Sequence, residues 1–405
     1  MSQKTILLIG TLDTKGAEYA YVRKLIVERG HHALVLDAGI IGEPHFSPDI
    51  SAEVVAQAGG TSLAELRRRA DRGIAIEVMA RGAAQFYAKG KFDGVLGLGG
   101  SGGSTIATAA MQVLPLGVPK LMVSTLVCFG DGAPYVGVKD INLMYSVVDI
   151  AGLNRLLRRI FVNAVGAVCG MVEQRLPPVE EKQKPLLATT MLGVTTPCGN
   201  VVREHLEQAG YEVFVFHTTG KGGQTMEGLI SDGLITGVAD ITTSEWSDEL
   251  VGGVMNAGPH RLEAAGRKGI PQVVSCGALD IVDFWTYDTV PAQFKDRILY
   301  KHNPHITLMR TTPEECAELG RIMAQKLNQT QGPTALFIPL QGLSAIDKEG
   351  QPFYLPEADA ALFDALRRNI HPPVELIELD LHINDPVFAV AMADRLLEML
   401  MVQTE

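Results

Sequence analysis

The feature that most constrains the fold of this chain is a pattern of apolar runs and helical segments that occurs twice in the same order. Short apolar runs such as Thr5–Ile9 alternate with stretches whose apolar residues recur at helical spacing, which is typical of an α/β fold with a parallel sheet. From about residue 186 the pattern restarts, with Leu186–Leu192 as its first strand. The other strands expected from such runs are 33–36, 94–98, 121–124, 211–216, 335–339 and 374–379.

The two halves also echo one another in detail. Gly94-Val95 is matched by Gly237-Val238, and the run 117–124 is matched by the run 269–276, with the correspondences in the same order along both halves. We therefore expect two similar open, parallel-sheet α/β domains, consistent with an internal duplication. The first is predicted over residues 1–175 and the second over residues 185–405, joined by a polar, proline-bearing linker at 173–184.

Residues 97–104 read Gly-Leu-Gly-Gly-Ser-Gly-Gly-Ser and lie between an apolar strand and a helix-forming segment. Glycines at such a junction leave backbone N–H groups accessible at the positive end of the helix dipole, which is an arrangement that binds phosphate. A tight turn requires one or two glycines, whereas residues 97–103 contain five. The chain has no Gly-Lys-Ser/Thr motif and no G-x-G-x-x-G motif after the first strand. The cluster therefore predicts a phosphate site, with ATP, a dinucleotide and other phosphorylated metabolites all left open.

Further candidates follow from the rule that ligands bind beyond the carboxyl ends of the strands in open α/β sheets. Lys15 can bring a positive charge to a phosphate, and Asp13 can contact magnesium or a ribose. Helix capping by Asp13 and Thr14 is the alternative interpretation, and the loop 124–131 is expected at the same sheet edge. The candidate nucleotide-binding residues are Thr11, Asp13, Lys15, Thr61, Gly99, Gly100, Ser101, Gly102, Gly103 and Ser104.

In the second half, residues 242–248 read Thr-Thr-Ser-Glu-Trp-Ser-Asp where the first half has its glycines. Hydroxyls and carboxylates suit a metal or a polar substrate and would repel bare phosphate. The candidate catalytic residues are Glu245, expected in an open cleft facing the first domain, with Lys301 and His302 supplying positive charge or proton transfer to an acidic substrate. The alternative for Glu245 is a capping role in the helix that begins near Ser244.

Composition excludes several classes of protein. The 405 residues carry a net charge of −11, which argues against nucleic acid as the main partner. No apolar run reaches the length of a membrane span, and no signal sequence is evident, so a cytoplasmic protein is expected. Five widely spaced cysteines indicate neither a disulfide framework nor a zinc site. A mean hydropathy of +0.14 and the apolar stretch Ile160–Val172 predict a homo-oligomer.

Segments 9–16, 97–103, 300–304 and 339–344 resemble a family of mostly uncharacterised bacterial and fungal proteins. The family is related to the N-terminal ATP-binding region of the tomato mosaic virus resistance protein, and the resemblance spans nearly the whole chain. It implies two Rossmann-like subdomains with ATP and magnesium held in the first. The glycine cluster and the turn Thr11–Asp13 carry over as nucleotide contacts, whereas the antiviral activity of the plant protein does not carry over.

Together these observations predict an ATP-binding protein with a second polar site between its domains for a small polar or acidic metabolite. The enzyme hypothesis is ATP-dependent activation or phosphorylation of that metabolite. The alternative is a nucleotide-sensing or partner-binding module without turnover.

Overall fold

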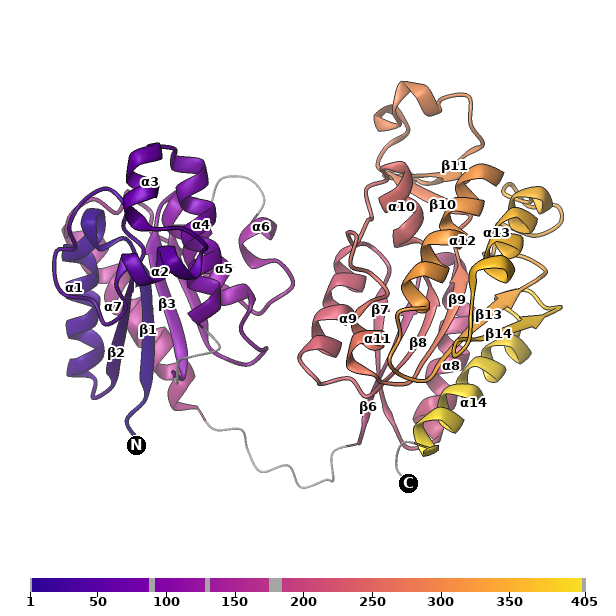
Figure 1. Ribbon diagram of the computed structural model, residues 1–405, viewed down its shortest axis with the longest axis horizontal. Helices are drawn as coiled ribbons and strands as arrows, with labels where there is room; N and C mark the ends of the chain where they lie inside the picture. Colours follow the sequence, from indigo (N-terminus) through magenta and orange to yellow (C-terminus); the bar gives the residue numbers. More distant parts are fainter. Residues whose placement is uncertain (1, 87–91, 128–131, 175–183, 403–405) are drawn as a thin grey trace. The chain divides into compact units, whose positions relative to one another are not determined.

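The computed structural model describes residues 2–86, 92–127, 132–174 and 184–402, and the chain folds as two compact units, 1–178 and 179–405 (Figure 1). Most of the predicted linker and the end of the loop 124–131, including Asp131, lie outside the described residues.

Unit 1 is built on one sheet of five parallel strands in the order β2-β1-β3-β4-β5. Its strands are β1 (Thr5–Gly10), β2 (His32–Asp37), β3 (Gly94–Gly99), β4 (Lys120–Ser124) and β5 (Asn142–Tyr145). Its helices are α1 (Leu12–Glu28), α2 (Ala52–Ala58), α3 (Leu63–Arg69), α4 (Arg72–Gln85), α5 (Ser101–Gln112), α6 (Ala133–Val136) and α7 (Arg155–Glu173).

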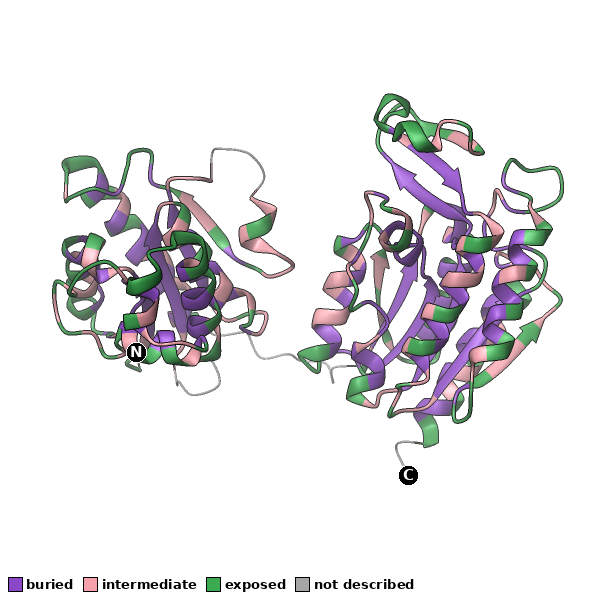
Figure 2. Ribbon diagram, turned by 45° about the horizontal axis from the view of Figure 1, so that its top comes forward, coloured by how far each residue is buried: buried purple, intermediate pink, exposed green. Residues whose placement is uncertain are grey.

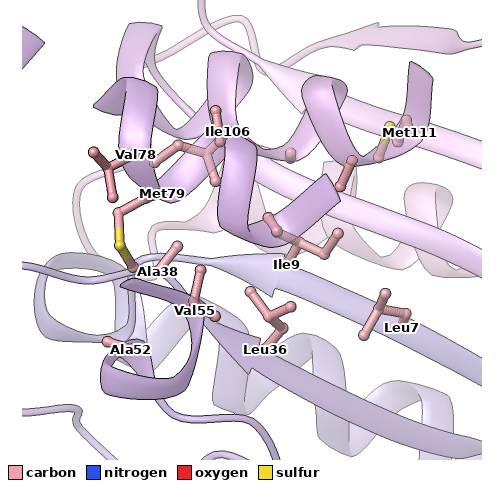
Figure 3. Packing of buried hydrophobic residues seen from close by; sticks show 14 of the residues in the cluster. Leu7, Ile9, Leu36, Ala38, Ala52, Val55, Val78, Met79, Ile106 and Met111 are labelled. Carbon is pink, nitrogen blue, oxygen red and sulfur yellow. The ribbon is translucent and has the colours of Figure 1, made fainter. Parts of the chain in front are cut away.

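Apolar side chains on both faces of this sheet form two separate cores, as expected for parallel strands buried on both sides. Leu7 and Ile9 of β1 pack with α2, α3, α4 and α5 on one face (Figure 3). Ile6 and Leu8 of the same strand pack with α1 and α7 on the other face. The buried strands of each unit lie inside a layer of helices whose outer faces are exposed (Figure 2).

Unit 2 contains a six-stranded parallel sheet in the order β14-β13-β9-β8-β6-β7. Those strands are β6 (Leu186–Met191), β7 (Glu212–His217), β8 (Gly237–Thr242), β9 (Gln272–Gly277), β13 (Thr334–Pro339) and β14 (Glu375–Leu379). Helices α8 (Thr196–Gln208) and α14 (Pro386–Val402) pack on one face, and α12 (Pro313–Leu327) and α13 (Pro356–Asn369) pack on the other. The remaining helices are α9 (Lys221–Ser231), α10 (Glu245–Val251) and α11 (Ala264–Lys268), with 3₁₀ turns at 193–195, 287–289 and 292–294.

A second, antiparallel sheet in unit 2 was not predicted from the sequence. It has the order β10-β12-β11 and consists of β10 (Ile281–Phe284), β11 (Leu299–Asn303) and β12 (Ile306–Arg310). These short strands follow one another without the intervening helices that made the parallel strands recognisable.

The predicted fold class is confirmed, because the two parallel sheets share one strand order. When each sheet is numbered from its own first strand, unit 1 has the order 2-1-3-4-5 and unit 2 has the order 2-1-3-4-5-6. The echoed segments lie on equivalent strands, with Gly94 in β3 matching Gly237 in β8, and β4 matching β9. The common topology fits an internal duplication.

The stretch Ile160–Val172 contributes to the core of unit 1, and its expected role in an oligomer interface stays a prediction. It lies in α7, whose Phe161, Val165 and Val168 are buried in the core of unit 1, so its apolar character is explained by packing within the unit. Within the described ranges, none of the helices combines the length and apolar character that crossing a membrane requires.

Candidate functional site

A pocket of about 900 Å³ opens at the carboxyl ends of the strands of unit 1. The strand order changes direction between β1 and β3, and this switch point is where doubly wound folds bind their ligands. The loop after β1 contributes Thr11 and Asp13, and the loop after β3 contributes Gly100–Gly103. The pocket therefore brings together the two segments that the sequence predicted as nucleotide contacts.

The glycine segment forms the start of α5 and leaves its first N–H groups without partners among the described residues. Gly100 is the N-cap residue, and no side chain caps the helix. The N–H groups of Ser101, Gly102 and Gly103 donate to no acceptor among the residues described. At Gly99 a Cβ atom would lie 2.9 Å from the Cα of Gly103, so a side chain at this position would block the turn. The loop is thus shaped to expose backbone donors at the positive end of a helix.

Asp13 lines the pocket, and one of its two carboxylate oxygens has no hydrogen-bond partner in the described structure. Its Oδ2 accepts hydrogen bonds from the N–H groups of Ile41 (2.8 Å) and Gly42 (3.2 Å), which holds the loop after β2 in place. Its Oδ1 is buried and has no hydrogen-bond partner in the described structure. Asp13 therefore does not cap its own helix, and Thr14 does not either, because its hydroxyl bonds the hydroxyl of Thr11 at 2.8 Å.

Three basic side chains line the pocket, and two of them are bound to the backbone. Lys15 Nζ donates to the carbonyl of Ile150 at 2.5 Å. Arg67 donates to the carbonyls of Ile40 (2.8 Å) and Gly42 (2.9 Å). The third, Arg72, is the first residue of α4 and was not predicted as a site residue.

The pocket also has an apolar part of its lining, which suits a planar base. This part is formed by side chains from the loop after β2 and from α3, α4 and α5, namely Ile40, Ile41, Leu66, Ala75, Ile76 and Ile106.

Three of the predicted nucleotide-binding residues lie outside this lining. Thr61 is in the turn between α2 and α3, and Gly99 is buried at the end of β3. Ser104 is buried and its hydroxyl bonds that of Ser124 at 2.8 Å, so it joins α5 to β4. These three residues shape the loops but do not face the pocket.

The equivalent place in unit 2 is closed. The loops after β6 and β8 are joined by a 2.7 Å hydrogen bond between the hydroxyls of Thr195 and Thr242, and both residues are fully buried. The hydroxyl of Thr243 donates to the carbonyl of Ser275. The hydroxyls that were expected to meet a polar substrate are instead satisfied within the protein.

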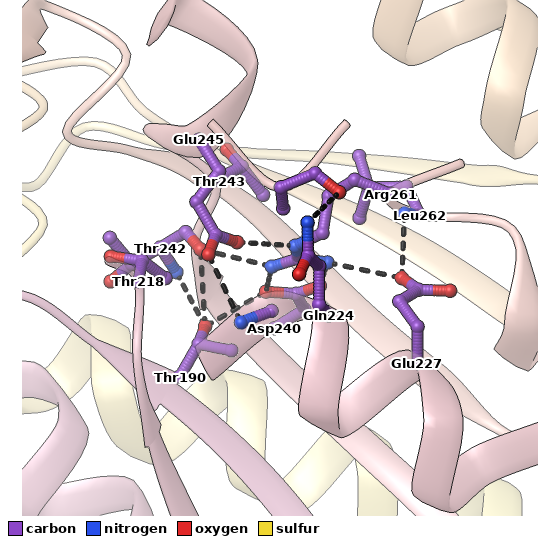
Figure 4. A network of polar contacts seen from close by, with 12 residues as sticks. Thr190, Thr218, Gln224, Glu227, Asp240, Thr242, Thr243, Glu245, Arg261 and Leu262 are labelled. Atoms are coloured by element: carbon purple, nitrogen blue, oxygen red, sulfur yellow. Dashed lines mark hydrogen bonds and ion pairs between the residues drawn. The ribbon is translucent and has the colours of Figure 1, made fainter. Parts of the chain in front are cut away.

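Glu245 belongs to a buried network centred on Arg261 (Figure 4). Arg261 pairs with Asp240 at 2.5 Å, with Glu245 at 2.7 Å and with Glu227 at 3.4 Å. Glu245 also accepts the N–H groups of Gly220 (2.8 Å) and Gly223 (3.0 Å) at the start of α9. Burial raises the pKa of the Glu245 carboxyl, and the charge of Arg261 opposes that rise.

The expectation that Glu245 faces an open cleft is therefore wrong, since its side chain is buried. It caps α9 rather than its own helix, which corrects the capping alternative as well. The other two candidate catalytic residues, Lys301 and His302, are exposed on β11. The Lys301 ammonium lies 5.0 Å from the ring centroid of Tyr287, a cation–π contact that already accounts for its position. The three residues do not form a site together within unit 2.

Unit 2 has a pocket of its own at a different place, beyond the carboxyl ends of β13 and β14, with a volume of about 1040 Å³. His382 lines it and donates from Nε2 to the carbonyl of Ser344 (2.9 Å), while Nδ1 accepts the N–H of Asn384 (3.1 Å). Burial lowers the pKa of His382, so the ring is neutral near pH 7. The exposed side chains of Leu340 and Tyr354 add apolar surface.

Three buried carboxylates surround Arg310 beneath this pocket, and one of them lines it. Arg310 Nη2 lies 2.6 Å from Asp359, which faces the pocket, and 3.6 Å from Asp347. Asp280 is fully buried, bonds the hydroxyl of Ser344 at 2.7 Å, and leaves its Oδ1 unpartnered within the described residues. Burial, reinforced by the charge of Asp347, raises the pKa of Asp280 to about 8 and that of Asp359 to about 7.

No group of three or more His, Cys, Asp or Glu side chains in the described parts of the chain is arranged to hold a metal ion. Sequence reasoning missed Arg72 and Arg261, but it singled out the polar cluster His382, Asn384 and Asp385 and the segment 339–344, which contribute to the β13–β14 pocket. The sequence signal for His382 and Asn384 is that these polar residues follow an apolar strand, whereas Arg72 and Arg261 lie in stretches without a motif.

These features define a protein of two doubly wound α/β units, with an open pocket at the switch point of the first and buried, hydrogen-bonded side chains at the equivalent place in the second. Models of the uncharacterised protein family UPF0261 match its N-terminal domain at residues 4–177 and its C-terminal domain at residues 184–400. The chain belongs to this family.

A UPF0261 protein from Clostridium tetani is 50% identical over 402 residues, covering 98% of this chain and 99% of the relative. The ToMV resistance protein Tm-1 of Solanum lycopersicum is 41% identical over 337 residues, which cover 81% of this chain and 45% of the tomato protein. The family resemblance seen in the sequence is thereby confirmed. Among solved structures, a UDP-N-acetylglucosamine 2-epimerase from Rickettsia bellii aligns with 67% of this chain and 79% of its own, at 12% identity and a TM-score of 0.25. A likeness of that size gives no guide to activity.

Proposed function

We propose that this protein binds ATP together with magnesium in the pocket of unit 1. The observation that carries the proposal is the start of α5, where the N–H groups of Ser101, Gly102 and Gly103 have no partner in the described structure and border the pocket. Backbone donors at a helix N-terminus bind phosphate through hydrogen bonds and through the helix dipole. Their place at the β1–β3 switch point is the usual position of a nucleotide in this topology.

The rest of the pocket fits a nucleotide as well. Its volume of about 900 Å³ has room for one, and the apolar part of its lining suits a base. The unpartnered Oδ1 of Asp13 offers an acceptor for a ribose hydroxyl or a ligand for Mg²⁺. Magnesium is commonly held by one or two carboxylates plus the phosphates of its substrate, so Asp13 and a bound triphosphate would suffice. When bound, the ion would neutralise phosphate charge.

We propose in addition that unit 2 binds a small polar or acidic metabolite in the β13–β14 pocket. The support is the combination of a neutral His382, the amide of Asn384 and the carboxyl of Asp359 on one wall of a pocket of about 1040 Å³. In the enzyme form of this proposal, ATP activates or phosphorylates that metabolite. The second candidate is nucleotide sensing without turnover, and the burial of Glu245 favours it because the expected catalytic acid is not accessible.

A direct test is calorimetric titration of the full chain with ATP in the presence of magnesium. One binding site per chain is expected. Absence of binding at millimolar ATP would remove the proposal. Mass spectrometry of small molecules that purify with the protein identifies the ligand of unit 2. Release of ADP on addition of that ligand would select the enzyme form, whereas bound ATP that stays intact would select the sensor.

The proposal also includes a homo-oligomer, and a sheet edge of unit 1 offers a candidate interface besides α7, where Val162 is 47% exposed. Strand β5 ends one edge of the sheet of unit 1, and Val147 and Val148 just beyond it are 53% and 37% exposed. Edge strands with exposed apolar side chains beside them are suited to association. Light scattering is expected to give a mass above the 43.6 kDa of one chain.

A further inference from the structure

Arg72 is the one basic side chain in the lining of the unit 1 pocket for which the described structure shows no hydrogen bond or ion pair. It is exposed at the start of α4, and Asp71 immediately before it caps that helix by accepting the N–H of Ile74. Its guanidinium faces the glycine loop, since a Cβ atom at Gly102 would lie 3.9 Å from Arg72 Nη2. The side chain thus stands beside the unpaired N–H groups of α5 with all its donors available.

We propose that Arg72 is a phosphate-binding residue that makes the unit 1 pocket select phosphorylated nucleotides over uncharged nucleosides. The inference rests on the proposed nucleotide site and names the residue that gives that site its selectivity. Backbone N–H groups supply hydrogen bonds but no net charge. A guanidinium supplies both, with donors in a planar fork that matches two phosphate oxygens.

The other two cations of the pocket are already engaged in holding the structure. The ammonium of Lys15 is bound to the carbonyl of Ile150, and Arg67 fastens the loop after β2 through the carbonyls of Ile40 and Gly42. Moving either group to a phosphate would leave those carbonyls without their donors. Arg72 can turn to a phosphate without breaking any bond in the described structure.

The balance of charges in the unit 1 pocket also supports a role for Arg72 in phosphate binding. Among the described lining residues, the carboxylates of Asp13, Asp71 and Asp149 stand against the three cations, so this part of the lining is close to neutral. Without Arg72 the lining would carry a net negative charge. A polyphosphate would then be repelled, whereas an uncharged nucleoside would be almost unaffected.

In unit 2 an arginine near the equivalent strand end is paired with carboxylates of the protein itself. There Arg261 lies beside the end of β8, and its charge is matched by Asp240, Glu245 and Glu227. In unit 1 the corresponding strand end is flanked by an arginine that has no carboxylate partner among the described residues. The anion that completes the arrangement in unit 1 is therefore expected to come from a ligand.

The test is calorimetric titration of the full chain and its Arg72→Gln variant with ATP, ADP, AMP, adenosine and inorganic tripolyphosphate. Loss of one charge-assisted contact predicts that Arg72→Gln binds ATP, ADP and tripolyphosphate about 10- to 100-fold more weakly. Adenosine should bind the variant within about 2-fold of the native protein, because it brings no phosphate to the missing charge. Arg72→Lys should be intermediate, since it keeps the charge but loses the fork.

Two further variants separate charge from structure. Arg68→Gln removes the same charge from α3, where Arg68 pairs with Glu65 outside the pocket, and should bind every ligand as the native protein does. Arg67→Gln loosens the loop after β2 and should therefore weaken adenosine as well as ATP, whereas Arg72→Gln should leave adenosine unchanged. The thermal unfolding midpoint of Arg72→Gln should equal that of the native protein.

The outcomes distinguish the two proposals. Native-like ATP affinity in Arg72→Gln, or an equal loss for ATP and adenosine, would overturn the role of Arg72 and leave the nucleotide site standing. A native protein that binds tripolyphosphate but gains nothing from the adenosine portion of ATP would overturn the ATP assignment. In that case the phosphate-binding role of Arg72 would still be supported if Arg72→Gln lost tripolyphosphate binding. A native protein that binds neither ligand would overturn both.

Discussion

Substitution of Gly100 by valine tests the phosphate loop with the least disturbance of the fold. A Cβ atom at Gly100 has one close neighbour, the hydroxyl of Thr125 at 3.5 Å, which is an ordinary contact distance. The backbone there has φ −89° and ψ −153°, an extended conformation that a side chain can adopt. Gly102 is a poorer choice, because its Cβ would lie 3.1 Å from Ile76 Cδ1 and require that side chain to move.

The expected magnitude follows from the donors that the new side chain would screen. Three N–H groups of α5 border the pocket beside Gly100, and a hydrogen bond to a charged acceptor contributes about 1.5–3 kcal/mol. Loss of two such bonds corresponds to at least about 3 kcal/mol, or a fall in ATP affinity of more than about 100-fold. Gly100→Ala, which adds one methyl group, should give a smaller loss in the same direction.

Calorimetric titration with ATP and magnesium measures these affinities, and circular dichroism during heating checks the fold. The matched control is Gly170→Ala in α7, where a Cβ atom meets nothing within 4 Å and where alanine favours the helix. This control should bind ATP normally and unfold at the same or a slightly higher temperature. Native affinity in a folded Gly100→Val protein would refute the assignment of the loop to phosphate.

The remaining predictions concern charge. Arg261→Met should destabilise unit 2 by about 3–5 kcal/mol in urea titrations because it leaves the buried carboxylates of Asp240 and Glu245, and the partly buried one of Glu227, without their counter-charge. ATP affinity should stay unchanged, and a loss under 1 kcal/mol would contradict the central role of the arginine. Burial raises the pKa of Asp280 to about 8, so the folded state binds more protons than the unfolded state, and stability should fall as the pH rises from about 4 to 8. Asp280→Asn should flatten that slope, and an unchanged slope would assign it to other groups. Asp13→Asn should weaken ATP about 10-fold and reduce the difference between titrations with magnesium and with a chelator. An undiminished magnesium effect would exclude Asp13 as a ligand of the ion.

Sequence patterns were sufficient for most of the fold because each parallel strand is short, apolar and followed by a helix of regular spacing. Residues 312–315 read Thr-Pro-Glu-Glu, a pattern that predicts a capping box, and the box forms: Thr312 accepts the N–H of Glu315 at 3.2 Å and Glu315 accepts the N–H of Thr312 at 2.8 Å. Asp385 likewise accepts the N–H of Val387 at the start of α14. Local signals of this kind act within a few residues of the chain. The antiparallel sheet of β10, β11 and β12 depends on pairing of short strands and has no comparable local signal.

Sequence reasoning predicted only the part of the candidate site that backbone N–H groups form. The glycines at 97–103 predict a loop that exposes its N–H groups, whichever side chains surround it. Glu245 failed as a prediction because its partner, Arg261, is sixteen positions away in a stretch with no regular pattern. Burial of Glu245 beside that arginine turns a candidate catalytic acid into part of the core. Arg72 was overlooked for the opposite reason, since its significance is the absence of a partner among the described residues, which only the structure can show.

The central claim is that ATP binds with its phosphates at the start of α5. A crystal structure of the full chain with magnesium and a non-hydrolysable ATP analogue tests it most directly. The account predicts phosphate oxygens within hydrogen-bonding distance of the amide nitrogens of Ser101, Gly102 and Gly103, with Arg72 turned towards them. An analogue bound in the β13–β14 pocket, or a unit 1 pocket left empty at saturating concentrations, would contradict it.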